Sequence, residues 1–310
     1  MNRDGRRLST FLVAMALFAA AVTYVAKTFE WSEALPLLSR IDAATFVGGS
    51  GAALLAYWWV RAWRWRLLMR GMGVECRFLS LYLCSSVALS LAVLTPLQSG
   101  EALKVELLRK CIGGGRLPGY SALVLERMAD LYAVVTLGIV SAATKALSPM
   151  SGAIVAMALI CLPVVAYRLF RLKPPAGRLG ELVAQMRSGV QSLPMFIVFL
   201  IATFAGWLLV AAAWQACLRS VSVHVDAIEL LGLLALVTLA TLASFVPAGL
   251  GVAEAGISGV LINYGIDPPL AQAGALAMRA FSVLVIGFGG LHLLWLRLHW
   301  KYARPDDPLP

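Results

Sequence analysis

The chain has 310 residues, of which 60% are hydrophobic and 14% are charged, and its formal net charge at pH 7 is +10. Soluble domains carry about 25% charged residues, so this composition excludes an ordinary soluble globular domain. The positive charge does not indicate nucleic-acid binding, because Lys and Arg flank apolar segments and form no basic patch with interleaved aromatic residues.

Eight apolar segments are expected to form helices, each near the roughly 20 residues that a helix needs to cross a bilayer. In chain order they are 8–26, 42–60, 79–97, 121–144, 150–167, 194–214, 228–247 and 272–296. The first follows a basic N-terminus but lacks a small-residue cleavage site, so we interpret it as an uncleaved span. The longest hydrophilic stretch, 168–191, is too short for a separate catalytic domain. We therefore predict one all-α polytopic membrane domain over residues 1–310.

Two of these segments end in sequences that break a helix. The first continues as Pro96-Leu97-Gln98-Ser99-Gly100-Glu101, and the second as Pro247-Ala248-Gly249-Leu250-Gly251-Val252-Ala253-Glu254. Backbone groups freed at membrane depth are tolerated only against protein or a wet cavity. We expect short helices after the breaks, over 101–110 with Ser99 as its N-cap and near 252–262.

Charge counting predicts that the broken segments are re-entrant. If both turn back and the N-terminus is cytoplasmic, 20 of the 26 Lys and Arg residues lie inside and 4 outside, with Arg127 and Arg279 within spans. If both cross, the split is 13 to 11, and if only the first turns back it is 17 to 7. The positive-inside rule favours about six transmembrane helices plus two re-entrant broken helices, with eight spans as the alternative and both termini cytoplasmic.

The two broken segments also suggest an internal repeat. Each unit, about 42–144 and 194–296, contains a span, a helix broken by Pro and Gly, a Glu, and a later span with an Arg. The interval from Glu101 to Arg127 is about the same as that from Glu254 to Arg279. In the preferred topology the two units run in opposite directions, and inverted repeats with broken helices are typical of transporters.

Ionisable residues at membrane depth are the candidate site. Insertion of each such charge into the bilayer costs at least ~2.5–3.5 kcal/mol of free energy unless the charge has a partner or lies in a wet cavity. The predicted substrate-binding residues are Pro96, Ser99, Gly100, Glu101, Glu126, Arg127, Asp130, Pro247, Gly249, Gly251, Glu254 and Arg279. The loop N–H groups and the two arginines would suit an anionic group such as a phosphate. Glu101 and Glu254 would hold the arginines without substrate, or carry protons; alternatively, the charges are ion pairs that only fix packing.

A second basic cluster, Arg61, Arg64 and Arg66, alternates with tryptophans. We interpret the tryptophans Trp58, Trp59, Trp63 and Trp65, together with these arginines, as an interfacial belt. The alternative is that the arginines contact lipid headgroups. The five cysteines and three histidines show no metal-ligand spacing, so we expect neither a metal site nor a cofactor.

The motif set resembles a known family. The chain is similar to the lysylphosphatidylglycerol synthase transmembrane region, a family also called flippase-like or UPF0104. The motifs that carry this resemblance are Arg61…Arg64-Trp65, Pro96…Gly100-Glu101, Glu126-Arg127…Asp130, Pro247-Ala248-Gly249-Leu250-Gly251…Glu254 and Arg279. The resemblance covers about residues 8–300 and implies a lipid flippase-like fold. Where the family commonly has Gly after the second Pro, this chain has Ala248. The aminoacyl-transferase domain joined to some members has no counterpart here, so lysylphosphatidylglycerol synthesis is not implied.

The leading hypothesis is a flippase-like protein that moves or presents an anionic lipid across a bacterial inner membrane. The candidate lipids are a phospholipid, a hopanoid-pathway lipid or a polyprenyl-linked lipid. One alternative is an intramembrane enzyme that modifies a lipid headgroup, although the sequence holds no nucleophile–base pair or metal ligand set. Another is a non-catalytic membrane partner of a separately encoded lipid or glycan biosynthetic enzyme.

Overall fold

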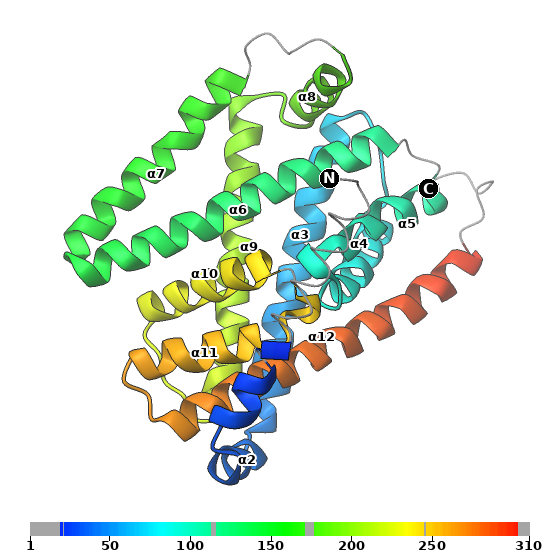
Figure 1. Ribbon diagram of the computed structural model, residues 1–310. Helices are drawn as coiled ribbons and strands as arrows, with labels where there is room; N and C mark the ends of the chain where they lie inside the picture. Colours follow the sequence, from blue (N-terminus) through cyan, green and yellow to red (C-terminus); the bar gives the residue numbers. More distant parts are fainter. Residues whose placement is uncertain (1–18, 21, 113–115, 171–176, 245, 303–310) are drawn as a thin grey trace, which may run out of the picture.

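The structure, a computed structural model, describes residues 19–20, 22–112, 116–170, 177–244 and 246–302. These residues form helices and no strands (Figure 1). The helices are α2 (Trp31–Ser39), η1 (Ala44–Ser50), α3 (Gly51–Gly71), α4 (Phe78–Ala92), η2 (Pro96–Ala102), α5 (Leu103–Ile112), α6 (Arg116–Ala146), α7 (Pro149–Phe170), α8 (Arg178–Gly189), α9 (Leu193–Arg219), α10 (Ala227–Ser244), η3 (Pro247–Gly249), α11 (Val252–Asn263) and α12 (Pro268–Tyr302). The prediction of an all-α membrane fold is confirmed.

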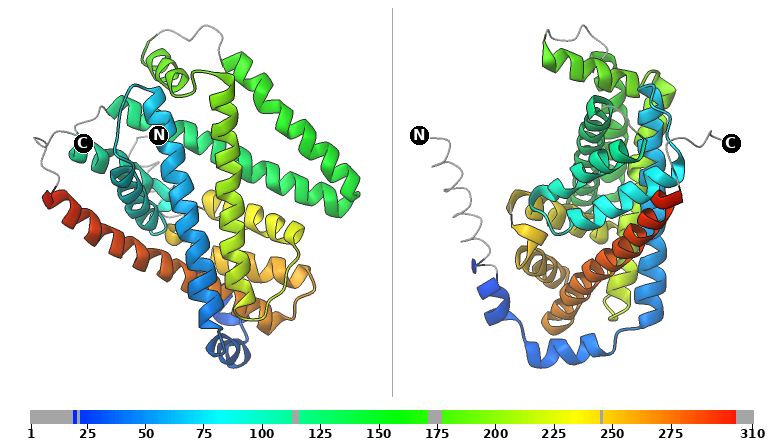
Figure 2. Two further views of the ribbon diagram at one scale, coloured as in Figure 1. Left: turned by 180° about the vertical axis from the view of Figure 1, so that it is seen from behind. Right: turned by 90° about the vertical axis from the view of Figure 1, so that its right-hand side faces the viewer.

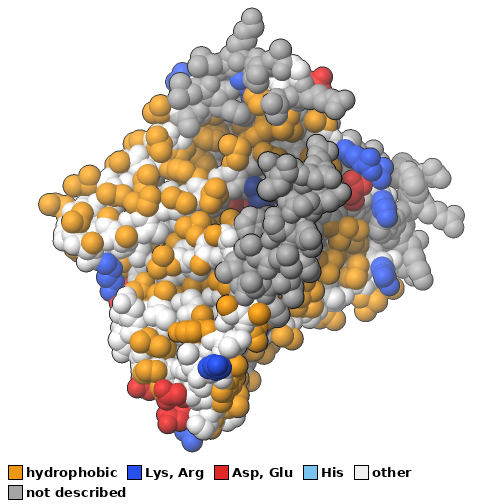
Figure 3. All heavy atoms as spheres, viewed as in Figure 1, with side chains coloured by type: hydrophobic (Ala, Val, Ile, Leu, Met, Phe, Trp, Pro, Cys, Tyr) orange, Lys and Arg blue, Asp and Glu red, His pale blue; other side chains and the backbone are white. Residues whose placement is uncertain are grey.

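Within the described ranges, three helices are long and apolar enough to span a bilayer: α9, α10 and the Pro268–Leu298 stretch of α12. A fourth candidate is the bent pair Trp31–Ser39 and Ala44–Gly71, whose axes differ by 75°. α6 is 31 residues long, but it carries Glu126, Arg127 and Asp130 along its length. Hydrophobic side chains are spread widely over the coloured part of the face in Figure 3, where charged side chains are few, as expected of a protein surrounded by lipid.

α3 and α9 pack side by side along much of their length (Figures 1 and 2). They are antiparallel, since Gly49 lies against Ala216 near one end and Gly71 against Met195 near the other. A Cβ on Gly49 would come within 3.1 Å of the Cβ of Ala216. Small residues of this kind let membrane helices approach closely.

Each broken segment folds back on itself. α4 packs against α5 beyond the η2 turn, and α10 packs against α11 beyond the η3 turn. η2 and η3 are in contact, so the two turns meet (Figure 1). A helix follows each break as predicted, but the breaks begin earlier than predicted, because α4 ends at Ala92 and α10 at Ser244 rather than at residues 97 and 247.

In each half of the chain, the helix before the break packs against a long helix of the other half. α4 lies against α12, and α10 lies against α6. One buried apolar cluster includes Trp58, Leu218 and Leu233, and a second includes Trp65, Leu83 and Phe199. The site described below lies where these helices converge.

Some sequence expectations need revision. Segment 8–26 falls mostly outside the described residues, so its role as a span stays a prediction. The helices α2 and α8 were not predicted, because α2 contains Pro36 and α8 is polar. The second short helix starts at Val252 as expected, whereas the first, α5, starts at Leu103 rather than at residue 101.

Candidate functional site

The turn between α4 and α5 is held by a threonine. The Gly100 N–H donates to Thr95 Oγ1 at 2.8 Å, and Gln98 adopts a left-handed φ of +53°. A Cβ on Gly100 would lie 3.0 Å from the backbone of Ala92, so glycine is required by the close approach. The prediction that Ser99 caps the helix is wrong: Ser99 is exposed inside η2, and Thr95 supplies the hydroxyl.

The turn between α10 and α11 is held by a carboxylate. Ala248, Gly249 and Gly251 have φ values of +56°, +58° and +79°. The Gly251 N–H donates to Glu254 Oε2 at 2.7 Å, which satisfies one of the orphan amides at the start of α11. The expectation of a free Gly251 N–H for a phosphate is therefore wrong, because the chain's own Glu254 occupies that donor.

Each turn holds a Glu–Arg pair. In the first half, Arg127 is ion-paired to Glu101, and its Nη1 also donates to Gln98 Oε1 at 2.9 Å. In the second half, Arg279 is ion-paired to Glu254, and its Nη1 donates to the Ala248 carbonyl at 3.1 Å. In both halves, then, an arginine from a long helix is tied to the glutamate and to the turn of a broken helix.

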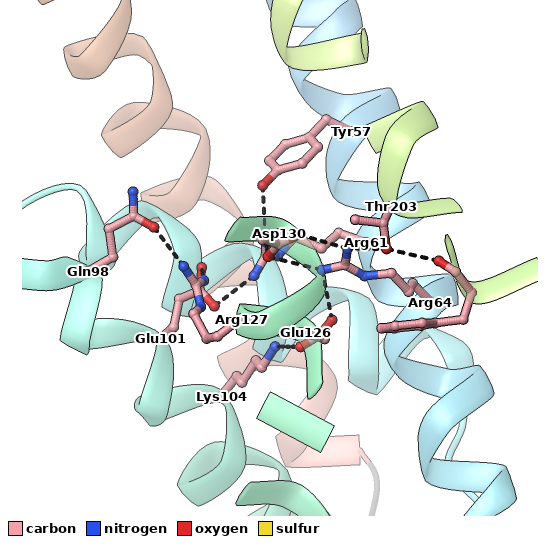
Figure 4. Close-up of polar contacts among 11 residues, drawn as sticks. Tyr57, Arg61, Arg64, Gln98, Glu101, Lys104, Glu126, Arg127, Asp130 and Thr203 are labelled. Carbon is pink, nitrogen blue, oxygen red and sulfur yellow. Dashed lines mark hydrogen bonds and ion pairs between the residues drawn. The ribbon is translucent and has the colours of Figure 1, made fainter. Parts of the chain in front are cut away.

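The first pair belongs to a larger buried network (Figure 4). Arg61 Nη2 donates to Glu101 Oε2 at 2.7 Å, and its Nη1 donates to Asp130 Oδ2 at 3.1 Å. Arg64 Nη1 donates to Asp130 Oδ1 at 2.7 Å. Asp130 thus links the two arginines of α3 to α6.

The network continues toward α5 and α9. Glu126 is ion-paired to Arg64, at 3.4 Å, and to Lys104. The Lys104 ammonium also lies 4.8 Å from the centre of the Trp65 ring, a cation–π contact. Arg64 donates to Thr203 Oγ1 of α9 at 2.9 Å. Charges buried this deeply require such partners, and here each has at least one.

The interpretation of residues 58–66 as an interfacial belt is wrong for four of its seven members. Arg61 and Arg64 are 4% and 3% exposed. Trp58 and Trp65 are also buried. These four side chains follow the three- and four-residue spacing of one helix face. The rest of the belt differs: Trp59 and Trp63 are exposed, and Arg66 is half-buried and lies over the Phe78 ring.

A cavity of about 260 Å³ lies between the two halves and is lined by both Glu–Arg pairs. Arg61 and Gln98 also reach it. Most of its wall is apolar and includes Trp58, Trp207, Trp214 and Phe281. A smaller cavity of about 150 Å³ lies between the two turns and shares Gln98 and Thr241 with the first.

Comparison with known proteins bears on this cavity. The family model for the lysylphosphatidylglycerol synthase TM region matches residues 11–290. The chain belongs to this family. The match includes both turns, both Glu–Arg pairs and every helix that lines the cavity. No curated protein and no solved structure matches the chain significantly.

Family membership and the apolar helices together make this a multi-pass membrane protein related to lipid handling. In this family member the structure brings Gly100, Glu101, Glu126, Arg127, Asp130, Gly249, Gly251, Glu254 and Arg279 to the two turns or to the charges beside them. Pro96 and Pro247 open the two turns, but their side chains lie outside the described part of the chain. Substrate binding by these residues stays a prediction.

Several site residues were missed by sequence reasoning. Lys104 lies one turn after Glu101, a spacing that could have placed it beside the site, although its ion-pair partner is Glu126. Thr203, Trp207 and Trp214 carried no signal, because they lie in an ordinary apolar segment of α9. Among the described residues, no group of three His, Cys, Asp or Glu side chains could hold a metal ion.

Proposed function

We propose that this protein is a flippase-like transporter that moves or presents an anionic lipid between the leaflets of a bacterial inner membrane. The observation that carries the proposal is the cavity between the two halves, into which Arg127 and Arg279 both reach. Guanidinium groups bind phosphate through paired charge-assisted hydrogen bonds. A cavity that offers two of them from opposite halves suits a lipid phosphate.

The size and lining of the cavity support a headgroup as the ligand. Its volume of about 260 Å³ is just below the roughly 300–1,000 Å³ of pockets that enclose a drug-sized molecule. A lipid headgroup would fit, and the acyl chains would remain in the bilayer. The tryptophans Trp207 and Trp214 would contact the glycerol backbone, where the polar headgroup meets the acyl chains, since aromatic rings suit a boundary between wet and apolar surroundings.

The packing of helices from one half against helices of the other half supports an alternating-access mechanism. The pairs α4–α12 and α6–α10 are equivalent in the inverted repeat that we propose for residues 42–144 and 194–296. In transporters of this architecture, one repeat rocks against the other around a site near the midplane. With both termini cytoplasmic, the cavity would alternate between the two leaflets. A separately encoded lipid or glycan biosynthetic enzyme would supply the lipid, and the protein itself would perform no chemistry.

The test is lipid movement in reconstituted vesicles. Purified protein is inserted into vesicles that contain a trace of phosphatidylglycerol with a fluorescent acyl chain, and a membrane-impermeant reductant irreversibly bleaches every probe molecule that reaches the outer leaflet. Wild-type protein should make almost all of the probe accessible. Arg127→Ala and Arg279→Ala should each stop the movement, while Arg116→Ala, which alters an arginine 63% exposed and away from the cavity, should not. Unchanged movement in both cavity variants would reject the site.

A further inference from the structure

The charges around the cavity do not balance. We define the cavity ion network as the charged side chains that line the cavity together with every charged side chain that a continuous chain of ion pairs connects to them. Its cations are Arg61, Arg64, Lys104, Arg127 and Arg279, and its carboxylates are Glu101, Glu126, Asp130 and Glu254. Among the residues that the structure describes, the network therefore has five cations against four carboxylates. One uncompensated positive charge remains beside the cavity, where an isolated charge is costly.

The carboxylates of the network have no free capacity for a further cation. Glu101, Glu126 and Asp130 each pair with two cations. Glu254 holds Arg279 with one oxygen and the Gly251 N–H with the other. A ligand that brought an ammonium group into the cavity would find no carboxylate left to receive it.

Two N–H donors beside the cavity, by contrast, have no hydrogen-bond acceptor among the described residues. Arg279 Nη2 and Arg61 Nε are buried, and neither has a hydrogen-bond partner in the described part of the chain. Both side chains line the cavity, and Arg61 is 4% exposed. Buried donors without a partner indicate a ligand or water that completes them. The open positions therefore call for an acceptor with negative charge.

We infer that the cavity selects a lipid whose headgroup carries one phosphodiester charge and no cationic group, so that its net charge is −1. This inference rests on the proposed function and adds the charge class of the ligand. The phosphate would accept from Arg279 Nη2 and from Arg61 Nε, and its charge would offset the excess cation in the group that contains Arg61. Zwitterionic lipids are disfavoured because their ammonium group finds no free carboxylate and returns the excess positive charge to the cavity, and uncharged lipids leave the network unbalanced.

The test compares four lipids on the unaltered, detergent-solubilised protein. Dioleoyl phosphatidylglycerol carries one negative charge, phosphatidylcholine none overall, phosphatidic acid up to two, and dioleoylglycerol has no phosphate. One charge-assisted hydrogen bond corresponds to roughly a 10- to 100-fold difference in affinity. Phosphatidylglycerol should therefore bind at least about tenfold more tightly than phosphatidylcholine or dioleoylglycerol. Equal binding of phosphatidylglycerol and phosphatidylcholine overturns the inference, and no variant has to fold for this result.

Charge-changing variants test whether the cavity causes the preference. Arg279→Gln should abolish it, and Arg279→Lys, which keeps the charge, should retain part of it. Glu254→Gln adds a second uncompensated charge and should shift the preference about tenfold toward phosphatidic acid. The matched controls are Arg116→Gln and Glu106→Gln, which change the net charge equally in an exposed pair and should leave the preference unaltered. An identical shift in the controls would overturn the inference.

A soluble phosphodiester, diethyl phosphate, separates a lipid from a free anion as the ligand. It should not displace phosphatidylglycerol at millimolar concentration, and displacement at the lipid's own concentration would overturn a lipid ligand. The outcome is separable from that of the vesicle assay. If the protein binds phosphatidylglycerol preferentially but moves no lipid, the transporter proposal is rejected and the inferred ligand class is kept. If it binds phosphatidylglycerol and phosphatidylcholine equally and moves both at equal rates, the transporter proposal is kept and the inferred ligand class is rejected.

Discussion

Asp130→Asn is the sharpest perturbation of the buried network. Asp130 accepts from Arg61 Nη1 at 3.1 Å and from Arg64 Nη1 and Nη2 at 2.7 and 3.2 Å. Asparagine has nearly the same volume but one neutral acceptor, so the loss is electrostatic rather than a packing defect. Removing one partner of a buried ion pair costs about 3–5 kcal/mol, because the other charge stays buried. A domain is stable by about 5–15 kcal/mol in total, so the variant should lose about a fifth or more of its stability.

The measurement is unfolding of the detergent-solubilised protein by increasing SDS, followed by tryptophan fluorescence. Glu106→Gln is the control, because Glu106 pairs with Arg109 and Arg116 on the exposed side of α5 and α6. Exposed pairs contribute about 0.2–1 kcal/mol, so the control should change little. If Asp130→Asn costs no more than the control, the network is not the buried, solvent-excluded arrangement described above.

Three further predictions concern the two turns, each measured by the same unfolding assay. Ala248→Gly should stabilise the protein by about 1 kcal/mol, because a left-handed φ costs an alanine roughly 1–2 kcal/mol and costs a glycine almost nothing. A loss of stability in this variant would contradict the prediction. Gly100→Ala should destabilise it by about 1–3 kcal/mol, since the new Cβ meets the Ala92 backbone at 3.0 Å, and an unchanged value would show that the turn can relax. Thr95→Val should cost about 1–3 kcal/mol by leaving the Gly100 N–H without its acceptor, whereas Thr95→Ser should cost less.

The two Glu–Arg pairs could be predicted from the sequence for a physical reason. Charged residues are so costly at membrane depth that each demands a partner, and few partners exist in so apolar a chain. The matching intervals from Glu101 to Arg127 and from Glu254 to Arg279 placed the pairs beside the turns. The Pro and Gly residues located both breaks, because no continuous helix can pass through them.

The remainder of the site depends on three-dimensional packing. Arg61 and Arg64 were interpreted as interfacial because alternating Trp and Arg is typical of a membrane boundary. Their burial follows from Asp130, which lies 66 residues or more away in sequence and is brought near only by the packing of α3 against α6. The role of Thr95 was missed because Ser99 stands closer to the expected helix start, and only the path of the turn decides which hydroxyl reaches the Gly100 N–H.

The most direct test of the cavity as a lipid site is photocrosslinking with phosphatidylglycerol that carries a diazirine in its headgroup. Protein in vesicles is irradiated, and the labelled peptides are identified by mass spectrometry. We predict that label concentrates on the cavity residues beside the two turns, around Gln98 and Thr241, and falls sharply in Arg279→Gln. Label confined to the exposed outer face of α7, around Met150 and Met157, and unchanged in that variant, would contradict the cavity as the place where the protein holds its lipid.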